Sequence, residues 1–514
     1  MRLRIPTTVA ATAVATTLLC PALLDTAFAA PANGAPKVSF TADPLATWQT
    51  NGIVWALAST GNVVYVGGTF DSVRPPGAAP GEKEVRRRNF AAFDATTGAL
   101  LPCAPSFTGD TATVRALKAS PDGRVLYAGG SFDRVGTTGV ASAVALNTAD
   151  CSLRKDFHPT VSATVRAIAT TDRAVYLGGD FHLVSGHTRN RIAALSPQGA
   201  LLPFAADIDA PVRALSVVPA RGRIYVGGDF ERINGRQTHS LAALNSTTGA
   251  TAHSYPHWLP PGSVVKSIAH DATRLYVGAE GRGPGIFDGR IAGRLSDDTM
   301  LWRDDCAGAT QVVLAYRGVL YSASHAHDCS GTPGGFPERN DRQHLLAQSP
   351  DNRTILHWFP DTNEGIGEDL GPRALTVERG VLWVGGEFTK VNDRPQQGLT
   401  RFGAGPDTAA PQVPALSLAT ASPGKATVRW QTSWDRDDAS LTYRLYRDGR
   451  LVSQQHKSST YWHRPWMSYT DVVPAGTRHT YRLDVTDGTN TSPKSAPLSV
   501  AVPTKTDART GSAE

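Results

Sequence analysis

The sequence lacks a second long apolar run after its N-terminal segment, so nothing beyond residue 29 is predicted to span a membrane. It also lacks a strong charge of either sign. The formal net charge is +6, and removing residues 1–29 leaves 49 basic and 44 acidic residues. The one tight basic run is Arg86–Arg88. Because the other Lys and Arg residues are scattered along the sequence, a nucleic-acid partner is not indicated.

The short motifs that identify common catalytic centres are absent as well. The sequence contains no Gly-x-Ser-x-Gly elbow, no His-Glu-x-x-His and no paired Cys-x-x-Cys. A glycosidase, in contrast, needs only two carboxylates held at the correct separation and leaves no such motif. The sequence therefore keeps both a binding protein and an enzyme open.

The N-terminus has the three parts of a secretory signal peptide. Met1–Arg4 is a short basic region, Ile5–Leu24 is apolar, and Ala27–Ala29 fits the small-x-small pattern before a cleavage site. We expect residues 1–29 to be removed and the mature protein to be secreted as a monomer without a membrane span.

Four cysteines follow the expected cleavage site. An even number in an exported chain favours disulfides, and four cysteines allow three connectivities. Proximity in the sequence predicts the pairs Cys103–Cys151 and Cys306–Cys329. A site in which cysteine and histidine bind a metal is the alternative for the second pair.

Glycine and proline are abundant, at 49 and 35 residues, which suits a turn-rich all-β protein. A Gly-Gly-x-Phe motif recurs, as in Val175–Phe181 (VYLGGDF), at steps of 62, 49, 49, 51, 44 and 63 residues. A period near fifty residues with short strands in each unit is typical of β-propellers. The first glycines, or their equivalents in eroded copies, are Gly67, Gly129, Gly178, Gly227, Gly278, Ser322 and Gly385.

Each unit contains segments that alternate at period two between turn residues. In the unit 165–207 these segments are VRAIA, AVYLGGDF, RIAALS and ALLPFA. Seven units of four antiparallel strands predict a seven-bladed β-propeller. The last unit has no fourth segment before residue 403, so Lys37–Phe40 is expected to supply it and close the ring.

The Gly-Gly-x-Phe motif is interpreted as structural. Paired glycines let a neighbouring strand approach closely, and the aromatic side chain fills the core between blades. The x residue is expected to accept hydrogen bonds from backbone donors in the following turn. It is Thr69, Ser131, Asp180, Asp229 or Glu387.

The C-terminal region follows a predicted linker at residues 403–411, which is rich in Gly, Pro and Ala. Residues 412–503 alternate at period two and predict a small immunoglobulin-like β-sandwich. With Trp430 as a core residue and Tyr481 as a corner tyrosine, this region resembles a fibronectin type III domain. Residues 504–514 are expected to form a disordered tail.

Residues 37–402 resemble the secreted bacterial propellers built from delta-sixty-type repeats. The resemblance is carried by the repeated YVGGDF motif and by the Asn-Gly that follows it, as in Glu231–Gly235 (ERING). It implies a propeller, to which residues 30–402 are assigned, and export from the cell. It implies no particular reaction.

The insertion Ser324–His344 in the sixth unit is the first candidate site. His325 and His327 fall on one side of an extended strand and could share a divalent cation such as Zn²⁺. The alternative is a polar loop held by a disulfide. The other candidate ligands in this insertion are Asp328, Asp341 and His344.

A carboxylate-rich loop at residues 360–372 is the second candidate. Its Glu364 and Glu368, beside Asp361 and Asp369, could bind Ca²⁺ or supply the acid and base for glycoside cleavage, or simply be solvated. Aromatic residues of the C-terminal region could stack on sugar rings or pack in its core. They are Trp434, Tyr461, Trp462 and Trp466.

Two functions therefore stay open. The first is a non-catalytic binding or display protein whose propeller loops recognise an extracellular polysaccharide or protein. The alternative is a secreted carbohydrate-active enzyme, a glycosidase or polysaccharide lyase with a fibronectin type III accessory module. The carboxylates at the mouth of the channel discriminate between them, because hydrolysis needs two that face each other across it.

Overall fold

The computed structural model describes residues 36–283 and 285–505. The predicted signal peptide and residues 506–514 of the predicted tail lie outside these ranges. The described residues form strands, with one short 3-10 helix at Pro219–Arg221 and no α-helix, so the protein is all-β. No helix in this part of the chain has the length and apolar character needed to cross a membrane.

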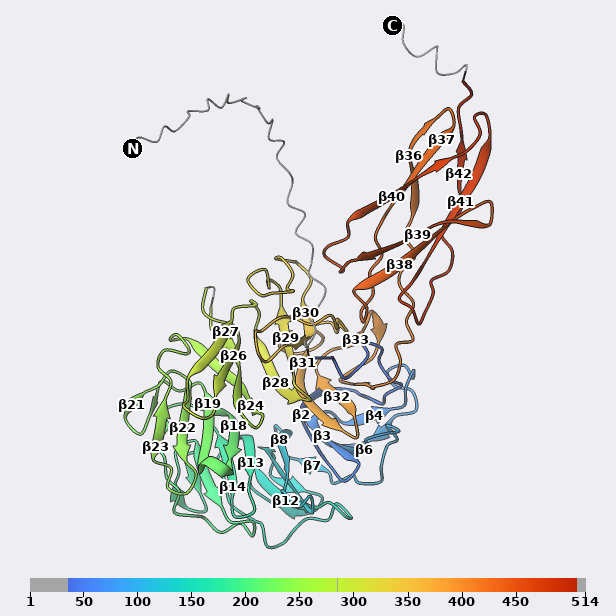
Figure 1. Ribbon diagram of the computed structural model, residues 1–514. Helices are drawn as coiled ribbons and strands as arrows, with labels where there is room; N and C mark the ends of the chain where they lie inside the picture. Colours follow the sequence, from blue (N-terminus) through green and yellow to red (C-terminus); the bar gives the residue numbers. More distant parts are fainter. Residues whose placement is uncertain (1–35, 284, 506–514) are drawn as a thin grey trace, which may run out of the picture. The chain divides into compact units, whose positions relative to one another are not determined.

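Between residues 53 and 402 the chain forms successive antiparallel sheets (Figure 1). The first strand of each sheet contacts the first strand of the next, and β31 of the last sheet contacts β2 of the first. This closed ring of sheets is a β-propeller. In chain order the sheets are β2 (Ile53–Thr60), β3 (Val63–Thr69), β6 (Phe90–Asp94); β8 (Thr113–Ala119), β9 (Val125–Ser131), β12 (Ala143–Asn147); β13 (Val165–Thr170), β14 (Val175–Gly179), β17 (Ile192–Leu195); β18 (Val212–Val218), β19 (Arg223–Gly228), β22 (Leu241–Asn245), β23 (Thr251–Ser254); β24 (Ser263–His270), β25 (Arg274–Gly281), β26 (Gly289–Arg294), β27 (Met300–Asp304); β28 (Thr310–Tyr316), β29 (Val319–Ala326), β30 (Gln343–Gln348); and β31 (Pro372–Glu378), β32 (Val381–Gly386), β35 (Leu399–Phe402).

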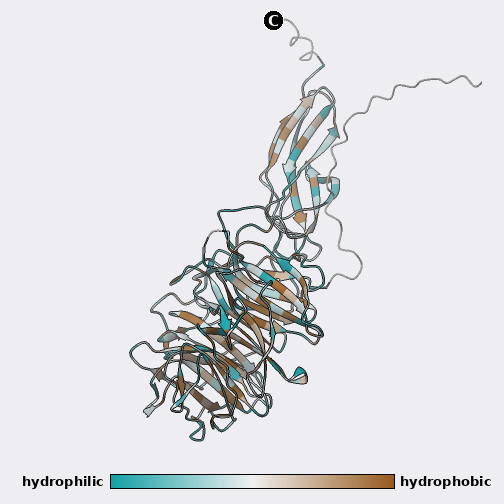
Figure 2. Cartoon of the chain, turned by 90° about the vertical axis from the view of Figure 1, so that its left-hand side faces the viewer, coloured by the Kyte–Doolittle hydropathy of each residue, from teal (hydrophilic) through white to brown (hydrophobic). Residues whose placement is uncertain are grey.

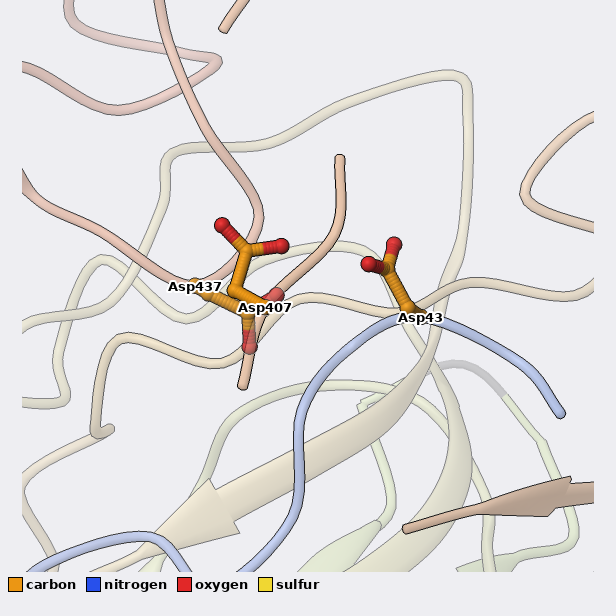
Figure 3. A group of neighbouring side chains, drawn as sticks. All are labelled: Asp43, Asp407 and Asp437. Atoms are coloured by element: carbon orange, nitrogen blue, oxygen red, sulfur yellow. The ribbon is translucent and has the colours of Figure 1, made fainter. Parts of the chain in front are cut away.

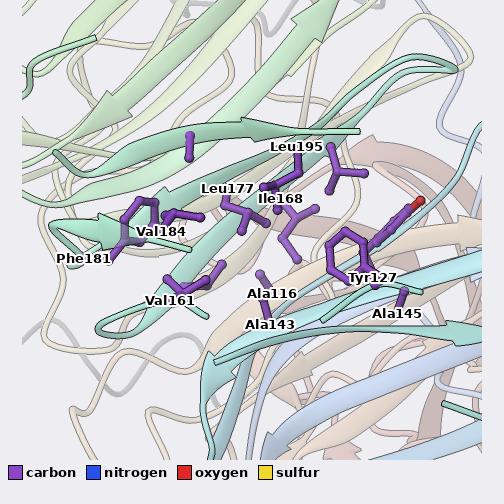
Figure 4. Packing of buried hydrophobic residues seen from close by; sticks show 14 of the residues in the cluster. Ala116, Tyr127, Ala143, Ala145, Val161, Ile168, Leu177, Phe181, Val184 and Leu195 are labelled. Atoms are coloured by element: carbon purple, nitrogen blue, oxygen red, sulfur yellow. The ribbon is translucent and has the colours of Figure 1, made fainter. Parts of the chain in front are cut away.

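Alternating side chains of neighbouring sheets build the core between them. In Figure 4, Tyr127 and Ala143 from one sheet pack with Ile168 and Leu177 from the next. Figure 2 shows the hydrophobic residues concentrated along the strands. Because each sheet is covered on both faces by its neighbours, its strands are buried along most of their length.

The paired glycines have the structural role that the sequence predicts. A Cβ added at Gly178 would lie 2.5 Å from Val212 of the next sheet, and one at Gly385 would lie 2.4 Å from Val54 of the first sheet. The second glycine of each pair faces a backbone carbonyl, as Gly179 faces Thr164 at 2.1 Å. The phenylalanines of the motif are buried. The interpretation of the motif as a packing device is therefore confirmed.

In most units the fourth strand is shorter than predicted. Among the described residues of the propeller, only β23 and β27 form full outer strands, whereas the segment ALLPFA makes a single bridge, between Leu195 and Leu201. Short pairings follow the Gly-Gly-x-Phe motif instead, and Asn234 and Gly235, both at positive φ, close one such hairpin. These short strands are β1 (Gln49–Thr50), β4 (Ser72–Arg74), β5 (Val85–Arg86), β7 (Phe107–Thr108), β10 (Arg134–Val135), β11 (Thr138–Gly139), β15 (Leu183–Val184), β16 (His187–Thr188), β20 (Arg232–Ile233), β21 (Arg236–Gln237), β33 (Lys390–Val391) and β34 (Arg394–Pro395).

The N-terminal segment closes the last sheet a few residues later than predicted. Thr41 N donates to Gly403 O and Leu45 N donates to Arg401 O, so residues 41–45, not Lys37–Phe40, run beside β35. Phe40 contributes its side chain instead, packing on Tyr321 in the core. The pairing begins after Lys37–Phe40 because the side chains of Phe40 and Ala42 are buried in the same core cluster as Phe402 of β35.

The C-terminal region is a sandwich of two antiparallel sheets around one core. Trp430 and Tyr481 are buried in it, and the Tyr481 hydroxyl donates to Asp471. One sheet has the order β36 (Leu416–Ser422), β37 (Lys425–Gln431), β40 (Trp466–Val472), and the other β39 (Arg450–Ser458), β38 (Ser440–Arg447), β41 (Arg478–Thr486), β42 (Leu498–Ala501).

Both predicted disulfides are present. Cys103 is bonded to Cys151, with a Cα–Cα distance of 5.5 Å, and Cys306 is bonded to Cys329. The first bond links loops that follow β6 and β12 in adjacent sheets. The second closes the base of the insertion Ser324–His344, and it removes the cysteine ligands of the alternative metal site.

Candidate functional site

The innermost strands place one polar or aromatic side chain per sheet around the channel. Each of these strands has a β-bulge near its start. In every strand the residue that the pairing register skips is this polar or aromatic residue. Because the innermost strands contact one another around the ring, the bulged residues form a circle near one end of the channel. This channel ring consists of Trp55, Arg115, Arg166, Arg213, Lys266, Gln311 and Arg373.

Most ring residues are paired with the x residue of the Gly-Gly-x motif in their own sheet. Arg166 donates two hydrogen bonds of 2.7 Å to Asp180. Lys266 lies 2.8 Å from Glu280. Arg213 pairs in the same way with Asp229, and Arg373 with Glu387. The x residue is therefore chiefly a partner of the channel ring. The sequence had instead predicted that it accepts hydrogen bonds from the backbone of the following turn.

Arg115 is the exception in the channel ring. The second sheet has Ser131 where the sheets of Arg166, Arg213, Lys266 and Arg373 have a carboxylate, and Ser131 bonds to Thr111 instead. Among the described residues Arg115 makes no ion pair or hydrogen bond. Its guanidinium lies 3.8 Å from the centre of the Trp55 ring, and Trp55 is held in turn by its indole N–H bond to Thr69.

The electrostatics of Arg115 reflect this lack of a partner. Burial and then the nearby Arg166, with Glu368 opposing, lower its pKa to about 10. The side chain is still a cation at neutral pH. A planar guanidinium stacked on an aromatic ring, with unused N–H groups, is suited to bind a carboxylate, sulfate or phosphate in a bidentate manner.

Two carboxylates of the channel, Glu280 and Glu368, have lowered pKa values. Burial alone would raise the pKa of Glu280, but Lys266 and Gln311 hold it below its usual value. Burial would also raise the pKa of Glu368, but the neighbouring Arg373 outweighs this effect, so the pKa of Glu368 is lowered. A glycosidase requires one carboxyl group with a raised pKa as general acid. Glu280 and Glu368 are shifted in the opposite direction.

A second polar site lies beside the blade-six insertion. This junction cleft has a volume of about 540 Å³ and combines residues of the insertion, of the loop before β31 and of the C-terminal sandwich. It contains cations, carboxylates and aromatics: Arg339 lies over Tyr461 and Arg436 over Trp434. Its lining residues are Arg339, Asn340, Asp341, Arg342, Gln343, His344, Asp361, Thr362, Asn363, Glu364, Asp393, Trp434, Arg436 and Tyr461.

The junction cleft brings together three of the candidate residues predicted from the sequence, namely Asp341, His344 and Glu364. His344 is almost fully buried, and its Nδ1 lies 3.2 Å from Asp361. Its Nε2 is buried and has no hydrogen-bond partner in the described part of the chain. Asp341 is exposed beside Arg339, at 3.7 Å. The cleft can therefore offer hydrogen bonds of both senses to a polar ligand.

The other candidates of the insertion, His325, His327 and Asp328, lie outside the junction cleft. His327 faces Glu338 at 2.9 Å and lines another cleft with Asp288. His325 is half-buried, and burial, followed by Arg342 and His344, lowers its pKa, which keeps the imidazole neutral. Asp328 accepts a hydrogen bond from Ser330 N. Metal binding by His325 and His327 stays a prediction.

Glu368 and the aromatic candidates lie in different parts of the protein. Glu368 belongs to the channel, where it lies 2.9 Å from Arg373. Trp434 and Tyr461 line the junction cleft, whereas Trp462 packs against Phe336 and Phe359. Trp466 is 60% exposed on the sandwich.

Sequence reasoning missed the channel ring. The repeated Val-Arg-Ala of the inner strands contains Arg115, Arg166 and Arg213, but simple alternation assigns these arginines to an ordinary surface. The signal that could have found them is the spacing to the x residue, which is 14 residues for Arg166 and Asp180 and 16 for Arg213 and Asp229.

The comparisons with known proteins concern the fold alone. No family model matches the chain. No curated protein matches it. Solved structures similar to it include a chain of the mitotic checkpoint complex (13% identity, 73% of this chain and 97% of that chain, TM-score 0.47). Others are the β-propeller domain of Myceliophteria thermophila Cps50 (Swd1) (9%, 70% and 100%, 0.43) and Saccharomyces cerevisiae Sqt1 (10%, 72% and 100%, 0.43). At these TM-scores the likenesses carry no argument about ligands.

Proposed function

We propose that the protein is a secreted, non-catalytic binding protein whose propeller recognises an extracellular polysaccharide bearing acidic groups. The observation that carries the proposal is Arg115, the cation of the channel ring that has no carboxylate partner. Its flat contact with Trp55 fixes the guanidinium while leaving its N–H groups available. An acidic group of the ligand would take the place that a carboxylate holds in the sheets of Arg166, Arg213, Lys266 and Arg373.

The state of the channel carboxylates supports binding over hydrolysis. Asp180, Asp229, Glu280 and Glu387 are each paired with a cation of their own sheet. A carboxylate in such a pair is a poor general acid, because the pair stabilises its ionised form. The mixture of cations, amides and aromatics in the junction cleft suits a second contact with a chain of sugars.

The domain organisation is part of the proposal. We assign residues 30–402 to a seven-bladed propeller, 403–411 to a linker and 412–503 to a fibronectin type III domain. The strand order β36-β37-β40 against β39-β38-β41-β42, with Trp430 and Tyr481 in the core, supports the last assignment. The two disulfides support export, since such bonds persist in oxidising compartments.

The test is the replacement Arg115→Ala in the mature protein. Loss of a bidentate charge-assisted contact should weaken binding of a uronic-acid polysaccharide by roughly 10- to 100-fold in calorimetry, or about 1.5–3 kcal/mol. Arg115→Lys should recover only part of this loss, because an ammonium cannot form the planar contact.

The matched control is Arg173→Ala, which removes an exposed arginine from a turn. It should leave binding unchanged. Equal losses in both variants would indicate a general charge effect and would contradict a site at Arg115. Neutral polysaccharides should bind the two variants and the parent protein alike.

A further inference from the structure

Five aspartates gather where the N-terminal segment, the linker and the C-terminal sandwich meet. Figure 3 shows Asp43, Asp407 and Asp437, which come from these three parts of the chain. In this trio one oxygen from each carboxylate lies within 4.8 Å of the others. The same holds for a second trio, Asp407, Asp435 and Asp487, so Asp407 is common to both. We call the five residues the aspartate cluster.

No protein cation balances the aspartate cluster. Among residues 36–283 and 285–505, none of the five carboxylates forms an ion pair with Lys, Arg or His. The nearest arginine in sequence, Arg436, is directed to Phe359 O and Asp393. Charges so close repel one another strongly unless a cation or protons neutralise them.

Two carboxylates of the aspartate cluster point to a missing ligand. Asp435 is only 5% exposed, and its Oδ1 accepts bonds from Asp437 N and Asp438 N while its Oδ2 has no partner among the described residues. Asp487 Oδ2 is fully buried and has no hydrogen-bond partner among the described residues. A buried carboxylate oxygen without a partner is costly, so it indicates an ion or ordered water at this position.

We propose that Asp407, Asp435 and Asp487 hold one calcium ion, with Asp43 and Asp437 beside it. Ca²⁺ takes six to eight oxygen ligands at about 2.3–2.6 Å, so oxygens within 4.8 Å of one another can share one ion. Mg²⁺ demands a smaller and more regular shell. The ion would connect the linker to the sandwich. This calcium proposal is independent of the polysaccharide proposal.

The experiment is calcium titration of the mature protein after removal of metals with a chelator. We expect about one Ca²⁺ per chain by calorimetry and a rise of at least about 2 °C in the melting temperature at saturating Ca²⁺. Asp407→Asn should weaken Ca²⁺ binding at least tenfold and abolish the rise. The control Asp172→Asn, in an exposed turn, should do neither.

Three results would overturn the proposal. They are no Ca²⁺ binding by the parent protein at millimolar concentration, equal affinity for Mg²⁺, and unchanged Ca²⁺ affinity in Asp407→Asn. If Asp407→Asn does not fold, Asp487→Asn is used in the same titration, since Asp487 Oδ2 has no other partner to lose.

Discussion

Arg290 and Asp304 form an ion pair that is completely buried between two sheets. Their side chains have no exposed surface, and Arg290 Nη2 lies 3.2 Å from Asp304 Oδ2. Gln348 donates a 2.6 Å hydrogen bond to the same Asp304 oxygen, and Arg290 donates to Ser322. The pair thus links the fifth and sixth sheets in the region where the Gly-Gly-x-Phe motif is most eroded.

Replacement Asp304→Asn should lower the free energy of unfolding by about 3–5 kcal/mol, because it leaves the Arg290 charge buried without a counter-ion. Denaturant unfolding followed by tryptophan fluorescence measures the loss. The neighbouring Asp305→Asn is the control: Asp305 is 63% exposed beside Arg303, so its effect should stay below about 1 kcal/mol. Similar losses in the two variants would mean that the buried pair has no special role.

Individual residues also show which part of the site the sequence could predict. The disulfide partners follow from their proximity in the sequence, and the glycines follow from the repeat, because each unit places them at the same point of the fold. Arg115 does not, since its importance depends on what is missing from the opposite position, where Ser131 replaces a carboxylate. A pattern of residue types describes the repeat and hides such an exception.

At the scale of elements, the innermost strands explain why a propeller can carry a polar channel. Each β-bulge turns one residue out of the alternating pattern and into the channel, so that a strand with two buried faces still displays a cation. The repeat that gives the fold therefore also repeats the site. A functional difference arises where one copy departs from the rest.

The closing segment is an element whose removal tests the ring. A mature chain that begins at residue 46 should melt at a clearly lower temperature than one that begins at residue 37, since it loses the pairing of residues 41–45 with β35 and the buried Phe40. Calorimetry measures both chains. An unchanged melting temperature for the shorter chain would show that this segment does not hold the ring closed.

At the scale of the whole molecule, the sequence predicted the architecture better than the sites. A period of about fifty residues predicts a succession of short antiparallel sheets, which the structure has. The junction cleft and the aspartate cluster were not predictable in this way. Trp434 approaches His344, and Asp43 approaches Asp407, only after the ring closes and the linker folds back. Local patterns contain no information about such meetings.

The measurement that tests the central claim most directly is a polysaccharide array read for both retention and released reducing ends. The mature protein should be retained on polysaccharides with carboxylate or sulfate groups and release no reducing ends, and Arg115→Ala should lose this retention. Release of reducing ends, or equal retention of the Arg115→Ala protein, would contradict a non-catalytic binding protein that recognises acidic groups through its channel ring.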